Sequence, residues 1–332
     1  MKYYETHYEE YVSSVNKMNL HPEILPIIKT LPNEINKLTN IIFYGASGVG
    51  KYSQSLYLMK KYSPIDLKYE KKITIQTEKQ EYNYKISDIH FEIDMSLLGC
   101  NSKILWNEIF LQIIDIVSVK QNKTGIILCK NFHLIHSELL EIFYSYMQQY
   151  NSIYSNIKIF FFILTEQLSF IPTKILNVCH LLRIQRPNKD LYKRLYNNSN
   201  NTELLETISL ESIVNIKEIR SFHLIKDSNN IPKDVFNTIC DSIIEWILVP
   251  DKIEFTNLRD VLYDILTYNL DVAECIWYIL TYFINNNHLN SKNITDILIQ
   301  SYYFFKYYNN NYRPIYHLES IIFYIIIKVH GY

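Results

Sequence analysis

Residues 45 to 53 read Gly45-Ala46-Ser47-Gly48-Val49-Gly50-Lys51-Tyr52-Ser53, a nearly complete phosphate-binding loop. In such a loop the glycines let backbone N–H groups turn inward around phosphates, and the lysine reaches the terminal phosphates. The residue after the lysine is normally a serine or threonine whose hydroxyl holds magnesium. Because Tyr52 stands there instead, the loop predicts a nucleotide cradle with a doubtful magnesium ligand.

The segments on either side of the loop have the patterns that a phosphate cradle requires. Ile41 to Tyr44 predicts a strand that leads into the loop, and Leu56 and Met59 continue a helical pattern after it. A helix that begins at this point aims further N–H groups at a bound anion. A chance match in an ordinary turn is therefore disfavoured.

The composition is that of a folded protein with more than one domain. The chain has 332 residues, of which 48% are hydrophobic and 20% charged, and this length exceeds the usual size of a single hydrophobic core. The six glycines, the 29 tyrosines and the many Asn, Ile and Lys residues indicate an AT-rich genome rather than a particular chemistry. Such a genome suits a large DNA virus or a parasite.

Charge and cysteine content exclude several classes of protein. With a net charge of −1 and a pI near 6.8 the chain is no polycation, so any contact with DNA must come from a local patch or from partner subunits. The five cysteines form no C-x-x-C pair, which favours reduced thiols and disfavours a zinc site. No apolar run approaches the ~20 residues of a membrane helix, and the first residues do not form a signal peptide. We expect a soluble protein of the nucleus or cytoplasm, or of the host cytoplasm or a viral factory if the source is viral.

Strand and helix patterns alternate up to about residue 187. Two alternating arms within residues 71–87 predict a β-hairpin, and a strand at 90–94 follows it. Strands buried on both faces are predicted at 125–129 and 157–164, with helices before and between them. This order predicts a parallel α/β sheet with the phosphate loop at the carboxyl end of its first strand.

The remainder of the chain is predicted to be helical. Asparagine-rich breaks divide it into a short helical unit at 188–231 and a longer bundle at 232–332. The bundle contains a dense aromatic run from Tyr302 to Tyr308. Because aromatic residues in a bundle are more often core or subunit contacts than platforms for stacked bases, we favour a packing role.

The order of these elements resembles the AAA+ clamp loaders, specifically the small subunits of replication factor C. One type of small subunit has a phosphate loop of the form G-x-S-G-x-G-K followed by a non-hydroxyl and then a hydroxyl residue, as in Ser47 to Ser53. The same type carries a hairpin like that at 71–87. The segment Asn177-Val178-Cys179 corresponds to the Ser-Arg-Cys turn of clamp loaders, and Ile219-Arg220-Ser221 resembles the position called sensor two.

The resemblance implies a domain organisation, a nucleotide site and partners. The domains would be an α/β AAA+ P-loop parallel-sheet domain at 1–187 with the β-hairpin insertion at about 71–87, a helical lid at 188–231 and an all-α collar domain at 232–332. The nucleotide site would hold ATP or ADP and would comprise Gly45, Ala46, Ser47, Gly48, Val49, Gly50, Lys51, Tyr52, Ser53 and Arg220. The implied partners are other clamp-loader AAA+ subunits, a sliding clamp and primer–template DNA, and no membrane.

Three departures from the family pattern predict a loss of catalysis. A Walker B strand should end in carboxylates that serve magnesium and the attacking water, but the strand here is followed by Lys130-Asn131. The arginine finger of the Ser-Arg-Cys turn is Val178, and either Thr165 or Glu166 takes the sensor position after the next strand. Loss of an arginine finger alone costs a factor of ~10³ or more in turnover. We therefore expect nucleotide binding with little or no hydrolysis. Lys130 in the vacated magnesium space would either allow nucleotide binding without a metal or fill the pocket with protein charge.

Two other groups of residues support weaker interpretations. His133 and His136 lie three residues apart without a third ligand nearby, so we expect no metal site. Lys71 and Lys72 are candidates for tracking DNA phosphates. The more ordinary interpretation of this lysine-rich region is a solvated face balanced by nearby carboxylates.

The sequence leads to one hypothesis and two rivals. The leading hypothesis is a non-catalytic or weakly catalytic clamp-loader-like subunit that acts in DNA replication. The first rival is an active P-loop ATPase that takes its acidic residue from Asp94 or Glu166. The second is a scaffold or interaction protein that retains the AAA+ fold.

Overall fold

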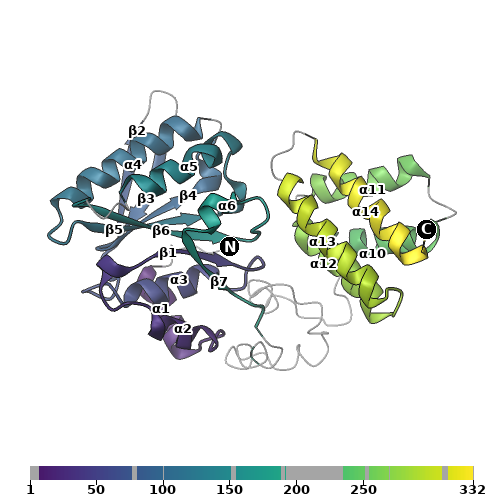
Figure 1. Cartoon of the computed structure of the whole chain (residues 1–332), viewed down its shortest axis with the longest axis horizontal. Coiled ribbons are helices and arrows are strands. Elements are labelled where there is room, and N and C mark those ends of the chain that lie inside the picture. Colours follow the sequence, from purple (N-terminus) through teal and green to yellow (C-terminus); the bar gives the residue numbers. More distant parts are fainter. Residues whose placement is uncertain are drawn as a thin grey trace, which may run out of the picture. The chain divides into compact units, whose positions relative to one another are not determined.

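The computed structural model describes residues 7–76, 81–99, 101–150, 155–187, 191, 235–250, 254–268, 270–308 and 313–331. The chain divides into two compact units between Lys226 and Asp227, and the first unit contains the phosphate loop (Figure 1). The lid predicted at 188–231, with Arg220, lies outside the described residues apart from Leu191.

A seven-stranded sheet forms the centre of the first unit. Its strands are β1 (Asn40–Tyr44), β2 (Lys71–Gln76), β3 (Glu81–Ile86), β4 (His90–Asp94), β5 (Thr124–Lys130), β6 (Lys158–Thr165) and β7 (Cys179–Arg183). Their order is β2-β3-β4-β5-β6-β1-β7. Strands β4, β5, β6, β1 and β7 are parallel, whereas β2 and β3 form an antiparallel hairpin that joins the sheet through β4. The phosphate loop therefore leaves a central strand with parallel neighbours on both sides.

Helices cover both faces of this sheet because its central strands are apolar on both faces. On one face lie α4 (Ser102–Val119) and α5 (Ser137–Gln149); on the other lie α1 (Tyr8–Lys17), α2 (Ile24–Thr30) and α3 (Lys51–Lys60) (Figure 1). Successive residues of β1 alternate between the two cores, with Ile42 in the first and Ile41 and Phe43 in the second. A four-residue helix, α6 (Thr173–Leu176), precedes β7.

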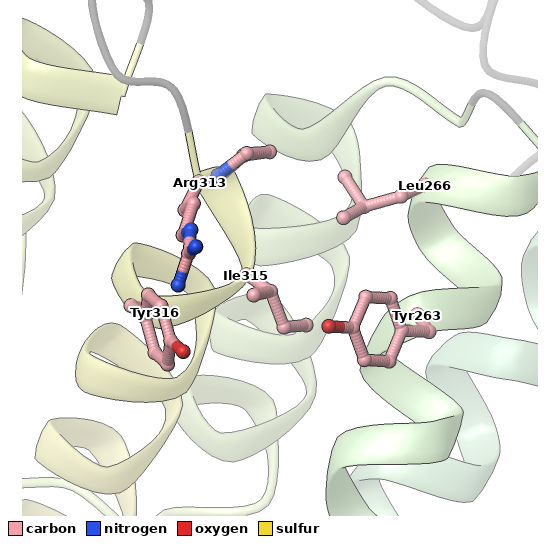
Figure 2. Close-up of a pocket in the computed structure, with 6 residues that line it drawn as sticks. Tyr263, Leu266, Arg313, Ile315 and Tyr316 are labelled. Carbon is pink, nitrogen blue, oxygen red and sulfur yellow. The ribbon is translucent and has the colours of Figure 1, made fainter.

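The second unit is a helical bundle with its own hydrophobic core. Its helices are α10 (Val235–Leu248), α11 (Phe255–Thr267), α12 (Val272–Asn285), α13 (Ser291–Tyr308) and α14 (Pro314–His330). Together with the parallel sheet and the phosphate loop, this bundle confirms the predicted fold class of an α/β P-loop domain followed by helices. A pocket at the start of α14 is lined by Tyr263, Leu266, Arg313, Pro314, Ile315 and Tyr316 (Figure 2).

The aromatic run of α13 divides between the core and the surface of the bundle. Phe304 is buried, whereas Tyr302, Tyr303 and Tyr307 are about half exposed. Packing thus accounts for part of the run. None of the helices in the described parts of the chain has the length and apolarity needed to cross a membrane.

His90 is a fully buried polar residue at the start of β4. Its ring centroid lies 4.8 Å from that of Tyr8, and its Nδ1 is hydrogen-bonded with the Ser87 hydroxyl. Burial, and secondly the charge of Lys120, lower the pKa of His90 from 6.5 to about 3. The unfolded chain therefore binds a proton below pH 6.5 that the folded chain rejects, so the stability that neutral His90 contributes is complete above that pH and is lost as the pH falls toward 3.

Replacing His90 with glutamine should reduce the acid sensitivity of folding. A single site with these pKa values accounts for a loss of about 2 kcal/mol of unfolding free energy between pH 8 and pH 5. Urea unfolding of His90→Gln should show an acid-induced loss smaller by about that amount, whereas His180→Gln, at an exposed position of β7, should behave like the wild type. If the unfolding free energy of His90→Gln falls between pH 8 and pH 5 as much as that of the wild type, a group other than His90 causes the loss.

Candidate nucleotide-binding site

The phosphate loop connects β1 to α3, as its sequence predicts. Position 45 must be glycine because the backbone of Ile184 comes close to it: a Cβ at this position would lie 2.1 Å from the Ile184 carbonyl oxygen. Ile184 is held there by a 2.8 Å hydrogen bond from its N–H to the carbonyl of Tyr44. Gly50, immediately before α3, has a φ of 101°, in the region that favours glycine. The backbone of a phosphate cradle is thus present.

Lys51, at the start of α3, points back to its own loop. Its Nζ donates hydrogen bonds to the carbonyls of Gly45 at 2.7 Å and Ala46 at 2.6 Å. It also lies 3.8 Å from Oε1 of Glu166, a residue that follows β6. The ammonium that would meet a terminal phosphate is therefore held at the loop, beside a carboxylate.

Of the two residues considered for the polar position after β6, Glu166 faces the phosphate loop through Lys51. Thr165 is buried and its hydroxyl donates to the carbonyl of Gln167 at 2.7 Å. The Glu166 carboxylate lies between Lys51 and His133, with its Oε2 3.6 Å from Nε2 of His133. Glu166 thus contacts one side chain from the start of α3 and one from the turn after β5.

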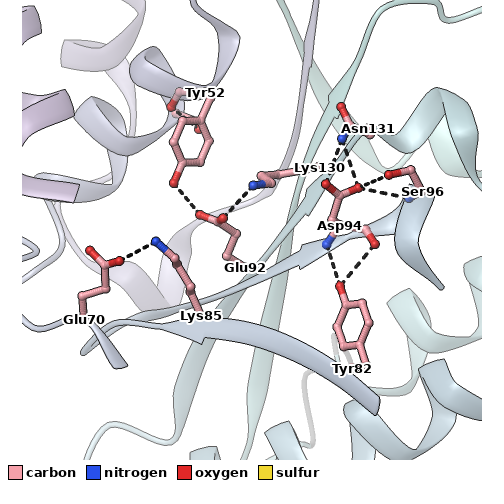
Figure 3. Close-up of polar contacts among 10 residues, drawn as sticks. Tyr52, Glu70, Tyr82, Lys85, Glu92, Asp94, Ser96, Lys130 and Asn131 are labelled. Atoms are coloured by element: carbon pink, nitrogen blue, oxygen red, sulfur yellow. Dashed lines mark hydrogen bonds and ion pairs between the residues drawn. The ribbon is translucent and has the colours of Figure 1, made fainter. Parts of the chain in front are cut away.

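Tyr52, Glu92 and Lys130 form a contact cluster beside the loop, which we call the tyrosine–glutamate–lysine cluster. The Tyr52 hydroxyl donates to Oε2 of Glu92 at 2.5 Å, and Lys130 Nζ donates to Oε1 at 2.8 Å (Figure 3). Lys130 Nζ also lies 5.2 Å from the centroid of the Tyr52 ring. The three side chains come from α3, β4 and β5, and the Glu92 side chain is only 7% exposed.

This cluster is electrically balanced without a metal ion. Burial, and secondly the charge of Glu92, raise the pKa of the Tyr52 phenol far above its usual range, so the phenol stays a neutral donor. Lys130 neutralises Glu92 in an ion pair. The edge of the Tyr11 ring packs at 87° against the Tyr52 ring, with 4.9 Å between centroids, and this contact holds the phenol in place.

The residues present do not fit a magnesium ion. Magnesium requires oxygen ligands, usually carboxylates, in near-octahedral geometry. Here the residue after Lys51 offers a phenol, β5 ends in the ammonium of Lys130, and both oxygens of Glu92 accept hydrogen bonds. No group of three His, Cys, Asp or Glu side chains among the described residues is placed to hold a metal. A nucleotide, by contrast, fits the glycine backbone and the lysine of the loop.

Asp94, the other acidic residue considered from the sequence, has a structural role. Its two carboxyl oxygens each accept from Nδ2 of Asn131 at 3.0 Å, and Oδ1 also accepts from the backbone and hydroxyl of Ser96 (Figure 3). The Tyr82 hydroxyl meanwhile donates to the Asp94 carbonyl and accepts from its N–H. These contacts close the end of β4, so the Asp94 carboxylate is already engaged.

Three other residues singled out from the sequence lie outside the elements that form the tyrosine–glutamate–lysine cluster: Lys71 and Lys72 are on β2, and Val178 precedes β7. Val178 is partly buried against the sheet core and carries no charge. Lys71 and Lys72 are both exposed on β2, but successive strand residues point to opposite faces, so the two do not share one surface.

Glu92 is the site residue that the motifs do not reveal. A carboxylate between Phe91 and Ile93 in a strand that is buried over four of its five residues is the feature that could have drawn attention to it.

Comparison with known proteins places these features in context. No family model matches the chain. The chain is 23% identical over 348 residues to "Replication factor C subunit 5" of Saccharomyces cerevisiae, covering 93% of this chain and 95% of the yeast protein. Two solved structures of Thermotoga maritima RuvB variants match 73% and 78% of this chain and 80% and 84% of their own, at 10% and 11% identity, with TM-scores of 0.39 and 0.40. The chain is thus a distant homologue of a replication factor C subunit, similar to it over nearly its whole length.

Proposed function

We propose that this chain is a clamp-loader-like subunit in DNA replication that binds ATP or ADP without magnesium and hydrolyses it little or not at all. In this proposal it contributes a nucleotide-holding wedge and a helical collar to a complex with other clamp-loader AAA+ subunits, a sliding clamp and primer–template DNA. The subunits with intact sites supply the hydrolysis. A viral source remains a prediction from composition.

The observation that carries this proposal is the tyrosine–glutamate–lysine cluster beside an intact phosphate loop. The glycines and Lys51 keep what is needed to hold phosphates, whereas Tyr52 and Lys130 stand where metal chemistry needs oxygens. Val178, in place of an arginine, removes a charge that would act on a neighbouring subunit's nucleotide. The residues that would bind phosphate are therefore retained, whereas those that would support hydrolysis are replaced.

The replication role is supported by the homology alone. The yeast protein is named as a subunit of replication factor C, and the similarity runs through both units of this chain rather than through the phosphate loop only. An active ATPase is less well supported, because Asp94 is engaged by Asn131 and Ser96, and Glu166 lies between two basic side chains. We therefore retain the clamp-loader proposal.

Nucleotide binding should be independent of magnesium and dependent on Lys51. Titration with a fluorescent ADP analogue should give dissociation constants within about twofold in excess magnesium and in excess EDTA, because Glu92 is engaged by Tyr52 and Lys130 and offers magnesium no free carboxylate oxygen. Lys51→Ala should weaken binding about tenfold or more, by losing a charged hydrogen bond. Lys60→Ala, on the same helix and paired with Asp66, is the matched control. Tightening of tenfold or more by magnesium would contradict the proposal.

Restoring oxygen ligands should restore a response to magnesium. In the triple variant Tyr52→Thr/Glu92→Gln/Lys130→Asp, where glutamine at position 92 avoids a buried charge without partners, magnesium should tighten ADP binding about tenfold, equivalent to roughly 1.4 kcal/mol, while the wild type shows no change. The wild type should also show no turnover above that of Lys51→Ala, alone or with DNA. Wild-type turnover near one per second that disappears in Lys51→Ala would count decisively for an active ATPase.

A contribution of the hairpin lysines to DNA binding is tested in the assembled complex. Because Lys71 and Lys72 point to opposite faces of β2, only one of them would meet a given row of phosphates, so Lys71→Ala/Lys72→Ala should lower the slope of log affinity against log salt by about 1 if that contact is made. A control pair, Lys29→Ala/Lys37→Ala, removes two exposed lysines outside the hairpin. An unchanged slope would assign Lys71 and Lys72 to a solvated face.

A separate affinity purification tests the proposed complex. If the tagged chain recovers neither AAA+ subunits nor a sliding clamp, the result would argue for the scaffold alternative.

A further inference from the structure

His21 is buried against the phosphate loop although it is distant from it in the sequence. It lies between α1 and α2, is 1% exposed, and its Nε2 is 2.7 Å from the carbonyl oxygen of Val49. A carbonyl can only accept, so Nε2 carries the proton and donates. The same ring faces Gly50, where an added Cβ would stand 3.6 Å from Nε2. His21 thus touches the last peptide of the loop before Lys51.

Neighbouring contacts tie the His21 backbone to α3. Oδ1 of Asn19 accepts from the backbone N–H of His21 at 2.8 Å and from Nε2 of Gln54 at 3.0 Å. Gln54 is buried in the first turn of α3. On its outer side, Nδ1 of His21 lies 3.2 Å from Oε1 of Glu23. The His21 backbone is therefore linked to α3 through Asn19, and its ring contacts Glu23 on one side and the loop on the other.

The hydrogen bond from His21 to the Val49 carbonyl also sets the orientation of the Gly50 N–H, although His21 makes no contact with that N–H. The Val49 carbonyl and the Gly50 N–H belong to one planar trans peptide, so they point in opposite directions. By holding the carbonyl toward the outside of the loop, His21 turns the Gly50 N–H toward the inside, where a phosphate would lie. Gly50, at φ 101° and without a Cβ, has the freedom to rotate away when that restraint is lost.

We infer that His21 is a positioning residue for nucleotide binding, which orients the Gly50 N–H toward a bound phosphate through the Val49 carbonyl. This inference rests on the proposed nucleotide site and adds a determinant outside the loop. It distinguishes two contributions to phosphate binding: Lys51 supplies charge through its side chain, whereas His21 acts through the backbone.

The experiment compares variants that keep or lose the Nε2 donor. Glutamine can present an amide N–H to the Val49 carbonyl, whereas phenylalanine keeps an aromatic ring but donates nothing. In EDTA, ADP should bind His21→Phe about tenfold more weakly than the wild type, and His21→Gln within about threefold of it. Lys51→Ala should also bind weakly, but through loss of charge.

Because the chain has few glycines, the Gly50 amide can be followed by NMR in protein labelled at glycine alone. The chain has six glycines, so protein labelled with ¹⁵N-glycine gives a spectrum of only a few amide signals, three of them from the loop. In the nucleotide-free protein the Gly50 signal should be sharp in the wild type, His21→Gln and Lys51→Ala, and broadened or doubled in His21→Phe. Unchanged Gly125 and Gly331 signals show that each variant is folded.

The outcomes separate this inference from the proposed function. A sharp, single Gly50 signal in His21→Phe, with ADP affinity within twofold of the wild type, would overturn the role of His21. If the wild type binds no ADP, the proposed nucleotide binding fails, and the nucleotide-free spectra still decide whether His21 orients the Gly50 peptide.

Discussion

The carboxylate of Glu92 is the group around which the site is arranged. It is almost fully buried, and a buried charge is tolerated only when it is paired and hydrogen-bonded. Lys130 supplies the opposite charge and Tyr52 a second hydrogen bond. Three elements that are far apart in the sequence, α3, β4 and β5, are thereby joined at the edge of the sheet where the phosphate loop begins.

This arrangement makes the three residues interdependent. Removal of Lys130 alone would leave Glu92 as an uncompensated buried charge, which in general costs more than replacement of the whole pair by apolar groups. Tyr52 likewise fills its position only because Glu92 offers an acceptor. A conventional metal site and the present cluster therefore differ at more than one of the positions 52, 92 and 130. Changing only one of these residues would leave a buried charge or hydrogen-bonding group without its partner.

The sequence predicts the fold more completely than the site. The β1 strand, the loop and α3 are predicted because glycine spacing and hydrophobic periodicity are local properties. That the strand β5 ends in a lysine rather than a carboxylate is also visible in the sequence. The partner of Lys130 is not, because Glu92 belongs to another strand and is brought near by the parallel pairing of β4 with β5. His21 is hidden for the same reason, since nothing in its local sequence indicates contact with Val49.

The hairpin has a consequence for the behaviour of the sheet itself. Among the described strands β2 is terminal, so one of its sides presents backbone donors and acceptors that another chain could pair with. Lys71 and Lys72 stand at the start of this strand, and charged lysines on an edge strand oppose pairing with a second edge. Whatever these lysines bind, their position gives them a protective role: they keep an Ile- and Thr-containing edge from acting as a template for aggregation.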